Sequence, residues 1–276
     1  MTTSTVRPAF ALTPTGEGRR GRRLGGISML VYTGGLIFIV SFVFAMLGLG
    51  GGMLYVPIFH WLGFGLKDVV IPLGLLLNGL NTLIALIPYG RKKLVDWRGG
   101  LPMAISALIF APIGGLLAPY VPNKWLLILF SVMVLIAAVR TLLVANQVDL
   151  DKEISFARLV IIGSLVAALA GLLGGLLGIG GGFIISPMLM WIGYKTKQAA
   201  ATTAYIVTFS SFSGFLGHVA HMTIDPQLLF VTVGAVILAS LAGAGFMANR
   251  AKPQWVKWFY GILLVVVAGK MLLPLL

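Results

Sequence analysis

The chain has 276 residues, of which 59% are hydrophobic and only 10% are charged, and its mean hydropathy is +1.02. An ordinary soluble domain is about 45–50% apolar and about 25% charged, so this composition excludes a soluble globular enzyme, a disordered protein and a fibrous one. Lys and Arg outnumber Asp and Glu by 20 to 7, but these charges lie between apolar stretches rather than in one patch. That distribution argues against nucleic-acid binding and favours a protein that crosses a lipid bilayer several times.

The apolar stretches predict an all-α polytopic membrane protein of about eight transmembrane helices. Residues 1–26 are polar and rich in arginine, and we interpret them as a cytoplasmic tail without regular structure. The next stretch, about 27–47, is too long for a cleaved secretory signal and reaches the roughly 20 residues that a span needs. Backbone groups in hydrocarbon must bond within their own segment, which favours helices. The further stretches lie at about 69–89, 100–120, 124–144, 158–178, 199–220, 227–248 and 255–275.

The second half of the chain repeats the first at a constant interval, which places Gly48 on Gly178. The matched positions are Gly48, Gly50, Gly51, Gly52, Pro57 and Trp61 in the first half, and Gly178, Gly180, Gly181, Gly182, Pro187 and Trp191 in the second. Four glycines, a proline and a tryptophan in one register are not explained by apolar composition alone. We therefore predict one membrane domain made of two homologous four-helix repeats, 27–145 and 157–276, a plan typical of secondary transporters.

The basic loop at 91–98 is the main guide to topology. With the tail inside and eight spans, this loop is also inside, as the positive-inside rule requires. The same count places Lys195, Lys197 and Arg250 outside, and opposite charge bias in two related halves is typical of an inverted repeat. The alternative is that short broken elements at 48–65 and 178–195 supply an extra crossing, but we prefer eight full spans. The sequence alone leaves the relative orientation of the two halves open.

The two glycine clusters are the predicted binding site. Each glycine costs a helix about 1 kcal/mol, and the proline that follows removes a backbone donor, so we expect the helix to unwind there. Unwound backbone at membrane depth must be buried in protein or line a cavity, and free N–H groups at a new helix start bind anions. Close helix packing by small residues is the alternative. The candidate residues are Gly48, Gly50, Gly51, Gly52, Gly178, Gly180, Gly181 and Gly182.

Polar residues in the following helices complete the candidate site. Asn78 and Asn81 are three residues apart and therefore share one helix face. The shift that relates the two halves places them on Thr208 and Ser211, so both halves carry a polar pair at the same position. Hydrogen bonding between helices is the alternative role, worth about 0.6 kcal/mol on average. From this region we include Asn78, Asn81, Thr202, Thr203 and Thr208.

The ionisable residues favour a small anionic substrate. All seven acidic residues fall in predicted loops or at span ends, which argues against a cation pump with an acidic relay. His218 and His221 lie near a span end, where we interpret them as interface histidines; the alternative is a group that titrates during proton-coupled transport. The chain has no cysteine, no Walker motif and no nucleophile elbow. We therefore predict neither an enzyme nor a cofactor or metal site.

The doubled glycine motif resembles the sulfite exporter TauE/SafE family of membrane permeases. The residues that carry the resemblance are Gly48–Pro57, Gly178–Pro187 and the stretch Ala199–Thr203. Pro72 and Leu73 stand where the second half has its two threonines, so the site is expected to be asymmetric. The resemblance implies a bacterial inner-membrane permease for small sulfur oxyanions or organosulfonates, such as sulfite, sulfoacetate or thiosulfate. We expect export; the alternatives are uptake coupled to protons or sodium, and a membrane assembly protein that transports nothing.

Overall fold

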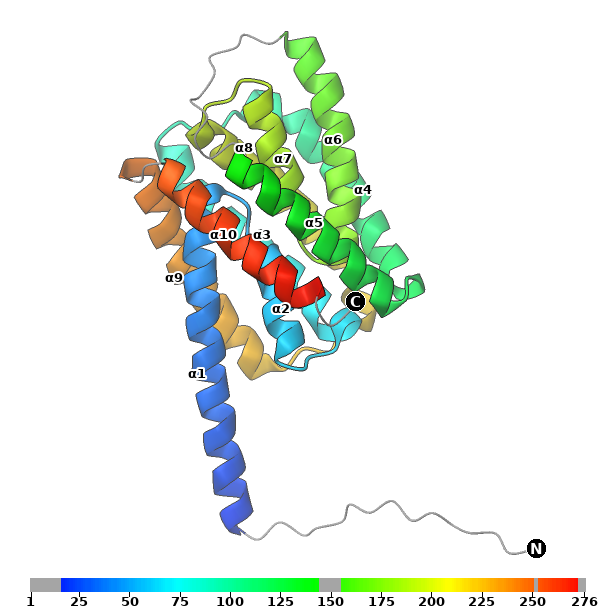
Figure 1. The fold of residues 1–276 in the computed structure, drawn as a ribbon, viewed down its shortest axis with the longest axis vertical. Helices are drawn as coiled ribbons and strands as arrows, with labels where there is room; N and C mark the ends of the chain where they lie inside the picture. Colours follow the sequence, from blue (N-terminus) through cyan, green and yellow to red (C-terminus); the bar gives the residue numbers. More distant parts are fainter. Residues whose placement is uncertain (1–15, 144–154, 251–252, 273–276) are drawn as a thin grey trace, which may run out of the picture.

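The structure is a computed structural model that describes residues 16–143, 155–250 and 253–272, and this part of the chain is a bundle of helices without strands (Figure 1). The first half contains α1 (Gly16–Leu47), α2 (Gly52–Trp61), α3 (Ile71–Arg91), α4 (Trp97–Leu117) and α5 (Asn123–Leu143). The second half contains α6 (Phe156–Leu177), α7 (Gly182–Trp191), α8 (Thr196–Leu216), α9 (Pro226–Asn249) and α10 (Pro253–Leu272). Short helical turns cover Leu66–Val70, Ala118–Tyr120 and Val219–His221. The prediction of an all-α protein is confirmed.

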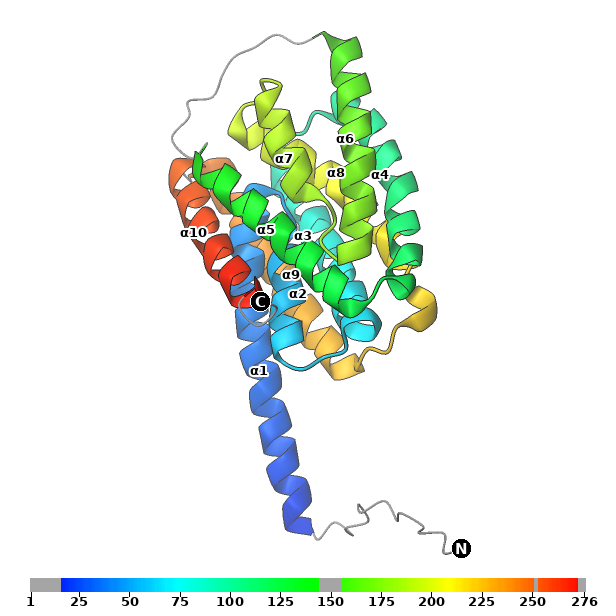
Figure 2. The ribbon, with the colours of Figure 1, turned by 45° about the vertical axis from the view of Figure 1, so that its right-hand side comes forward.

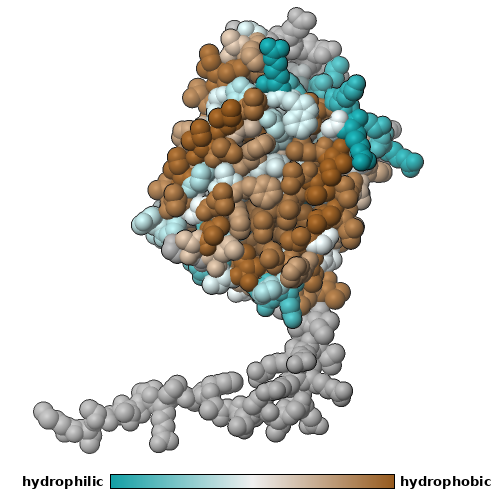
Figure 3. Space-filling view, turned by 180° about the vertical axis from the view of Figure 1, so that it is seen from behind, coloured by the Kyte–Doolittle hydropathy of each residue, from teal (hydrophilic) through white to brown (hydrophobic). Residues whose placement is uncertain are grey.

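Six helices within the described residues are long and apolar enough to cross a bilayer. The protein is therefore a multi-pass membrane protein, and the space-filling view shows an apolar surface with hydrophilic residues toward its two ends (Figure 3). That eight helices span the membrane stays a prediction, since the apolar part of α5 and the whole of α7 are shorter. The candidate spans are Leu30–Leu47, Leu66–Arg91, Trp97–Tyr120, Leu159–Leu177, Thr196–Leu216 and Pro226–Asn249.

Two short helices interrupt the pattern of full-length spans. Helices α2 and α7 have 10 residues each, or about 15 Å, which is half the thickness of the hydrocarbon core. Each follows a glycine cluster and reverses the direction of the helix before it. Helix α1 runs parallel to α3, because Asn81 of α3 bonds to the Ser41 carbonyl and Tyr89 bonds to the Met46 carbonyl. The glycine clusters thus form hairpins rather than kinks within one span.

The α1–α2 and α6–α7 hairpins open toward opposite ends of the bundle. The chain after α2 reaches one end, where the Asp68 carbonyl accepts a hydrogen bond from the Thr223 N–H group. The chain after α7 reaches the other end, where the Tyr194 hydroxyl donates to Asp96. We call these the Asp68 end and the Asp96 end. They are the lower and upper ends of the bundle in Figure 1.

Helix boundaries in the two halves recur at the interval of the sequence repeat. Helices α2 and α7 begin at residues 52 and 182, and α5 and α10 begin at 123 and 253, which is the same interval in both cases. Corresponding helices run in opposite directions: α3 leaves the Asp68 end, whereas α8 leaves the Asp96 end. Helices α5 and α10 lie side by side across the outside of the bundle (Figures 1 and 2).

The start of α1 and the basic loop 91–98 lie at opposite ends, so placing both in the cytoplasm is wrong. The preferred count of eight full spans omitted α2, which carries the chain back to the Asp68 end before α3 begins. Helix α1 also begins at Gly16, inside the segment interpreted as a tail, and its first part extends beyond the bundle (Figure 1). Residues 1–15 lie outside the described residues.

Reversal by the short helices collects the basic loops at one end. The Asp96 end carries Arg91, Lys92, Lys93, Arg98, Lys195, Lys197 and Arg250. The Asp68 end carries Lys67, Lys124 and Lys270, together with the arginines at the start of α1. The eight-span count placed loop 91–98 on one side of the membrane and Lys195, Lys197 and Arg250 on the other. In the structure all of these basic residues lie at the same end of the bundle.

We expect the Asp96 end to face the cytoplasm, because short basic loops are retained there. In this cysteine-free chain, cysteines placed at Lys93 and at Arg250 should resist an impermeant thiol reagent in intact cells, and one at Lys124 should react. The parent protein gives the background, and permeabilised cells show that each thiol is reactive. Labelling at Lys93 with protection at Lys124 would mean that the arginines at the start of α1 determine the orientation instead.

Candidate functional site

The first glycine segment, Gly48–Gly52, and the second, Gly178–Gly182, lie against each other inside the bundle. A β-carbon added to Gly52 would lie 2.7 Å from the Gly178 carbonyl oxygen, and one on Gly182 would lie 3.0 Å from the Leu49 carbonyl oxygen. Side chains at these positions would push the two backbones apart, so the absence of a β-carbon allows the contact. The structure therefore joins two segments that are far apart in the sequence.

Left-handed backbone conformations turn the chain from a long helix into a short one. Gly50 and Gly51 have φ angles of 93° and 121°, and Gly180 and Gly181 have φ angles of 68° and 81°. Residues with a β-carbon rarely adopt this region. The predicted unwinding at both clusters is confirmed, because α1 ends at Leu47 and α2 begins at Gly52, while α6 ends at Leu177 and α7 begins at Gly182.

The N-termini of α2 and α7 both lie at this meeting point. A helix N-terminus carries roughly half a positive charge on its free N–H groups. Among the residues whose side chains the structure describes, the carboxylates of Asp68, Asp96 and Asp225 are all at helix ends near the two ends of the bundle. The partial positive charge at the centre is therefore not neutralised by any of these carboxylates. Such a centre is suited to an anion.

Asn78 occupies the space between the two glycine segments. Its Oδ1 atom accepts a hydrogen bond of 2.7 Å from the Gly52 N–H group, and its Nδ2 atom donates one of 2.8 Å to Ser211 Oγ. A β-carbon added to Gly50 or to Gly180 would overlap atoms of this amide. The side chain thus takes the first N–H group of α2, which the sequence analysis assigned to substrate.

Asn81 belongs to a neighbouring cluster around Tyr55. Asn81 Nδ2 donates to the Tyr55 hydroxyl at 2.8 Å and to the Ser41 carbonyl at 3.2 Å. The Tyr55 hydroxyl donates to the Gly50 carbonyl at 3.2 Å, which connects this cluster to the first glycine segment. Asn81 Oδ1 is fully buried and has no hydrogen-bond partner among the described residues. The two asparagines therefore differ: Asn78 uses its oxygen, and Asn81 keeps its oxygen free.

The three threonines of α8 that the sequence analysis selected lie in different environments. Thr208 Oγ1 donates to Thr82 Oγ1 at 2.9 Å, which links α8 to α3. Thr203 Oγ1 is buried and has no partner among the described residues. Thr202 lies at the Asp96 end, where its hydroxyl accepts from the Asp96 N–H group at 3.1 Å. The structure therefore associates Thr202 with the start of α4 rather than with the glycine segments.

Several residues of this centre were not selected from the sequence. Tyr55 and Ser41 are matched by Ile185 and Gly171 in the second half, so a search guided by the repeat overlooks them. Ser211 was indicated as the counterpart of Asn81 but was not selected, because hydroxyls are common in membrane helices. Its contact with Asn78 depends on the crossing of α3 and α8, which sequence spacing does not reveal.

A second polar cluster links the two halves at the Asp96 end. Asp96 caps α4 by accepting a hydrogen bond of 2.8 Å from the Gly99 N–H group, and it accepts one of 2.6 Å from the Tyr194 hydroxyl. Burial, together with the hydrogen bond and the charge of Asp96, raises the pKa of Tyr194 well above its ordinary value. The hydroxyl therefore remains a donor throughout the physiological pH range, and the link between α4 and the α7–α8 loop is retained.

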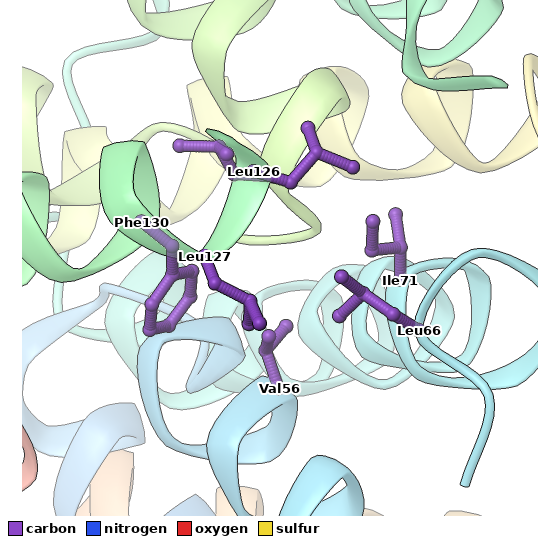
Figure 4. Close-up of a pocket in the computed structure, with 7 residues that line it drawn as sticks. Val56, Leu66, Ile71, Leu126, Leu127 and Phe130 are labelled. Carbon is purple, nitrogen blue, oxygen red and sulfur yellow. The ribbon is translucent and has the colours of Figure 1, made fainter. Parts of the chain in front are cut away.

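His218 and the apolar pocket of the structure do not add an anion-binding or metal-binding group to the candidate site. The ring Nε2 of His218 lies 2.9 Å from the Gly175 carbonyl oxygen, and the described residues contain no group of three acidic or histidine side chains arranged for a metal ion. An apolar pocket lies beside α2, α3, α5 and α6 (Figure 4). Its lining residues are Val56, Leu66, Ile71, Leu126, Leu127, Phe130 and Leu177, none of which offers a polar side chain to an anion.

A model of the sulfite exporter TauE/SafE family matches residues 33–271. The chain belongs to this family. Its relatives include a probable membrane transporter protein of Haemophilus influenzae, 27% identical over 84% of this chain and 91% of the relative. A probable membrane transporter protein of Methanocaldococcus jannaschii is 27% identical over 67% of this chain and 71% of the relative.

Plant members of the TauE/SafE family share a shorter region with this chain. Sulfite exporter TauE/SafE family protein 6 of Arabidopsis thaliana is 38% identical over 41% of this chain and 26% of the relative. No solved structure gives a significant match. Family membership and the apolar helices together make the protein a membrane transporter of the TauE/SafE family.

We predict that an alanine at Gly50 destabilises the protein more than an alanine at Gly63. Both glycines have positive φ angles, 93° and 86°, so the strained backbone of an alanine lowers the folding stability of both variants by a similar amount, about 1 kcal/mol. Only at Gly50 would the new β-carbon meet Asn78, because a β-carbon at Gly63 meets open space. Thermal unfolding in detergent should therefore give a lower Tm for Gly50→Ala. Equal Tm values would contradict the close packing described for the glycine segments.

Proposed function

We propose that this TauE/SafE family protein is a permease of the bacterial inner membrane that exports a small anion, sulfite or an organosulfonate. The observation that supports it most is the meeting of the α2 and α7 N-termini inside the bundle, away from the carboxylates of Asp68, Asp96 and Asp225. Helix N-termini at the middle of a membrane protein bind anionic groups in several transporter folds. The names of the plant relatives support sulfite as the substrate class.

Substrate binding in this proposal begins with an exchange of hydrogen-bond acceptors. In the structure, Asn78 Oδ1 lies 2.7 Å from the Gly52 nitrogen, and in this proposal it occupies the position that an anion oxygen takes during transport. When Asn78 rotates away, an oxygen of the substrate accepts the same N–H group, so the backbone donor stays satisfied throughout. The unpaired Thr203 hydroxyl supplies a further donor from α8. Weak neutral donors of this kind release the anion again, which a fixed lysine or arginine would resist.

Membrane potential supplies the direction in this proposal. The cell interior is negative, so each negative charge that leaves gains about 2.3 kcal/mol per 100 mV. The sequence has no Walker motif for ATP. The competing mechanism is uptake coupled to protons or sodium, with His218 or His221 as the titratable group. His218 is buried, and its ring Nε2 lies 2.9 Å from the Gly175 carbonyl oxygen.

The test is flux of sulfite from proteoliposomes. We expect an inside-negative potential, set by potassium and valinomycin, to accelerate efflux of internal sulfite. Asn78→Ala should reduce the flux at least about tenfold, because it removes the acceptor that keeps Gly52 satisfied between cycles. Asn249→Ala is the matched control, since the Asn249 side chain is exposed and bonds only within α9.

Other results would select the competing functions. Flux that follows a pH gradient and ignores the potential would support proton-coupled uptake. Sodium dependence would support coupling to sodium. A folded protein that moves neither sulfite nor any organosulfonate would be a membrane assembly protein rather than a permease.

A further inference from the structure

Asn81 carries a hydrogen-bond acceptor that has no partner among the described residues. This acceptor is its Oδ1 atom, and the whole side chain is fully buried. Both hydrogens of its Nδ2 atom are engaged, by the Tyr55 hydroxyl at 2.8 Å and the Ser41 carbonyl at 3.2 Å. Turning the amide around would place its oxygen against the Ser41 carbonyl oxygen, where two acceptors repel each other. The free atom is therefore the oxygen and not the nitrogen.

The position of Asn81 relates this oxygen to the proposed anion site. Asn81 follows Asn78 by three residues, so it lies on the same face of α3 and about 4.5 Å further along the axis. Asn78 holds the Gly52 N–H group, and Asn81 reaches the Gly50 carbonyl through Tyr55. A ligand that replaces Asn78 at the start of α2 therefore has Asn81 as its neighbour one turn along α3.

The chemistry of an amide oxygen restricts what that ligand presents to it. An oxygen of a fully deprotonated sulfite or sulfonate group repels an amide oxygen, since neither atom carries a hydrogen. An O–H or N–H group beside the anionic oxygens satisfies the buried acceptor, which otherwise stays unpaired away from water. Sites built to bond such a hydrogen strongly reject analogues that lack it.

We propose that Asn81 Oδ1 makes this transporter select anions that carry a hydrogen-bond donor next to their anionic oxygens. The inference rests on the proposed function and adds a specificity-determining residue to it. The donor has two chemical sources: a proton on the oxyanion itself, as in hydrogensulfite, or an ammonium group on an aminosulfonate, as in taurine. The anionic oxygens bond to the N–H groups of the glycine segments, and the donor bonds to Asn81.

The first experiment compares ligands on the wild-type protein in proteoliposomes. Taurine and propane-1-sulfonate have the same number of heavy atoms and differ by an ammonium group in place of a methyl group. If the aminosulfonate is the source of the donor, taurine should compete with sulfite at least about tenfold better than propane-1-sulfonate. If the proton on the oxyanion is the source, sulfite flux should rise as the pH falls through neutrality, while methanesulfonate flux stays constant.

The second experiment assigns the effect to one atom. Asn81→Leu keeps the size of the side chain and removes the acceptor, so it should reduce the preference for the donor-bearing ligand to near unity. Tyr55→Phe is the control: it removes the partner of Asn81 Nδ2 but leaves Oδ1 in place, so the preference should persist. Thermal unfolding identifies variants that do not fold, and in that case the wild-type comparison decides.

Each of the remaining outcomes overturns a different statement. Equal transport of donor-bearing and donor-free anions by the wild type would refute the role of Asn81 and leave the permease proposal standing. A preference that survives Asn81→Leu would assign donor recognition to another residue. Transport of donor-free anions only with sodium would mean that the oxygen binds a cation. Absence of flux for every anion would instead refute the proposed function.

Discussion

An unpaired backbone donor at the start of a helix is costly deep within a membrane protein, and α2 and α7 both begin there. Asn78 of α3 avoids this cost for α2 by accepting from Gly52, and at the same time it donates to Ser211 of α8. The arrangement requires both glycine segments to lack β-carbons, because the amide fills the space beside Gly50 and Gly180. One side chain thus fixes the relative positions of the two hairpins and of the two helices that cross between them.

The two halves are chemically unequal at this point. The counterpart of Asn78 is Thr208, which bonds to Thr82 and to the carbonyl of Ala204 rather than to the start of α7. Among the described residues, no side chain bonds to the N–H groups of Gly181 or Gly182. The N–H group at the start of α2 is therefore paired with a side chain of the protein, whereas the N–H groups at the start of α7 have no side-chain partner among the described residues. The two helix starts at the centre therefore differ chemically, which two identical halves would not allow.

The sequence predicted the helices and the breaks between them. It did not predict how far each helix extends through the membrane or where helices cross. Apolar length predicted the helices, and the repeated glycines predicted where α1 and α6 end. Hydropathy windows treat every apolar segment as a span, however, so the 10-residue α2 and α7 were not counted as returning helices, and the topology was misassigned. Spacing placed Asn78 and Asn81 on one face, but it did not reveal that one amide is occupied and the other has a free oxygen. Thr202 was grouped with Thr203 by adjacency, although adjacent residues on a helix point in different directions.

The α1–α2 hairpin also determines whether the first half passes between the two ends of the bundle an odd or an even number of times. Because α1 and α2 together bring the chain back to the Asp68 end, only α3, α4 and α5 carry it from one end of the bundle to the other. The chain therefore enters α6 at the Asp96 end, where Arg98 lies over the Phe156 ring. An odd number of passages means that a copy joined in tandem necessarily lies upside down relative to the first. One additional helix inserted between α5 and α6 would turn the second half over, and Ser211 would then face away from Asn78. The number of helices that pass between the two ends of the bundle before α6 is thus as essential to the central site as any residue within that site.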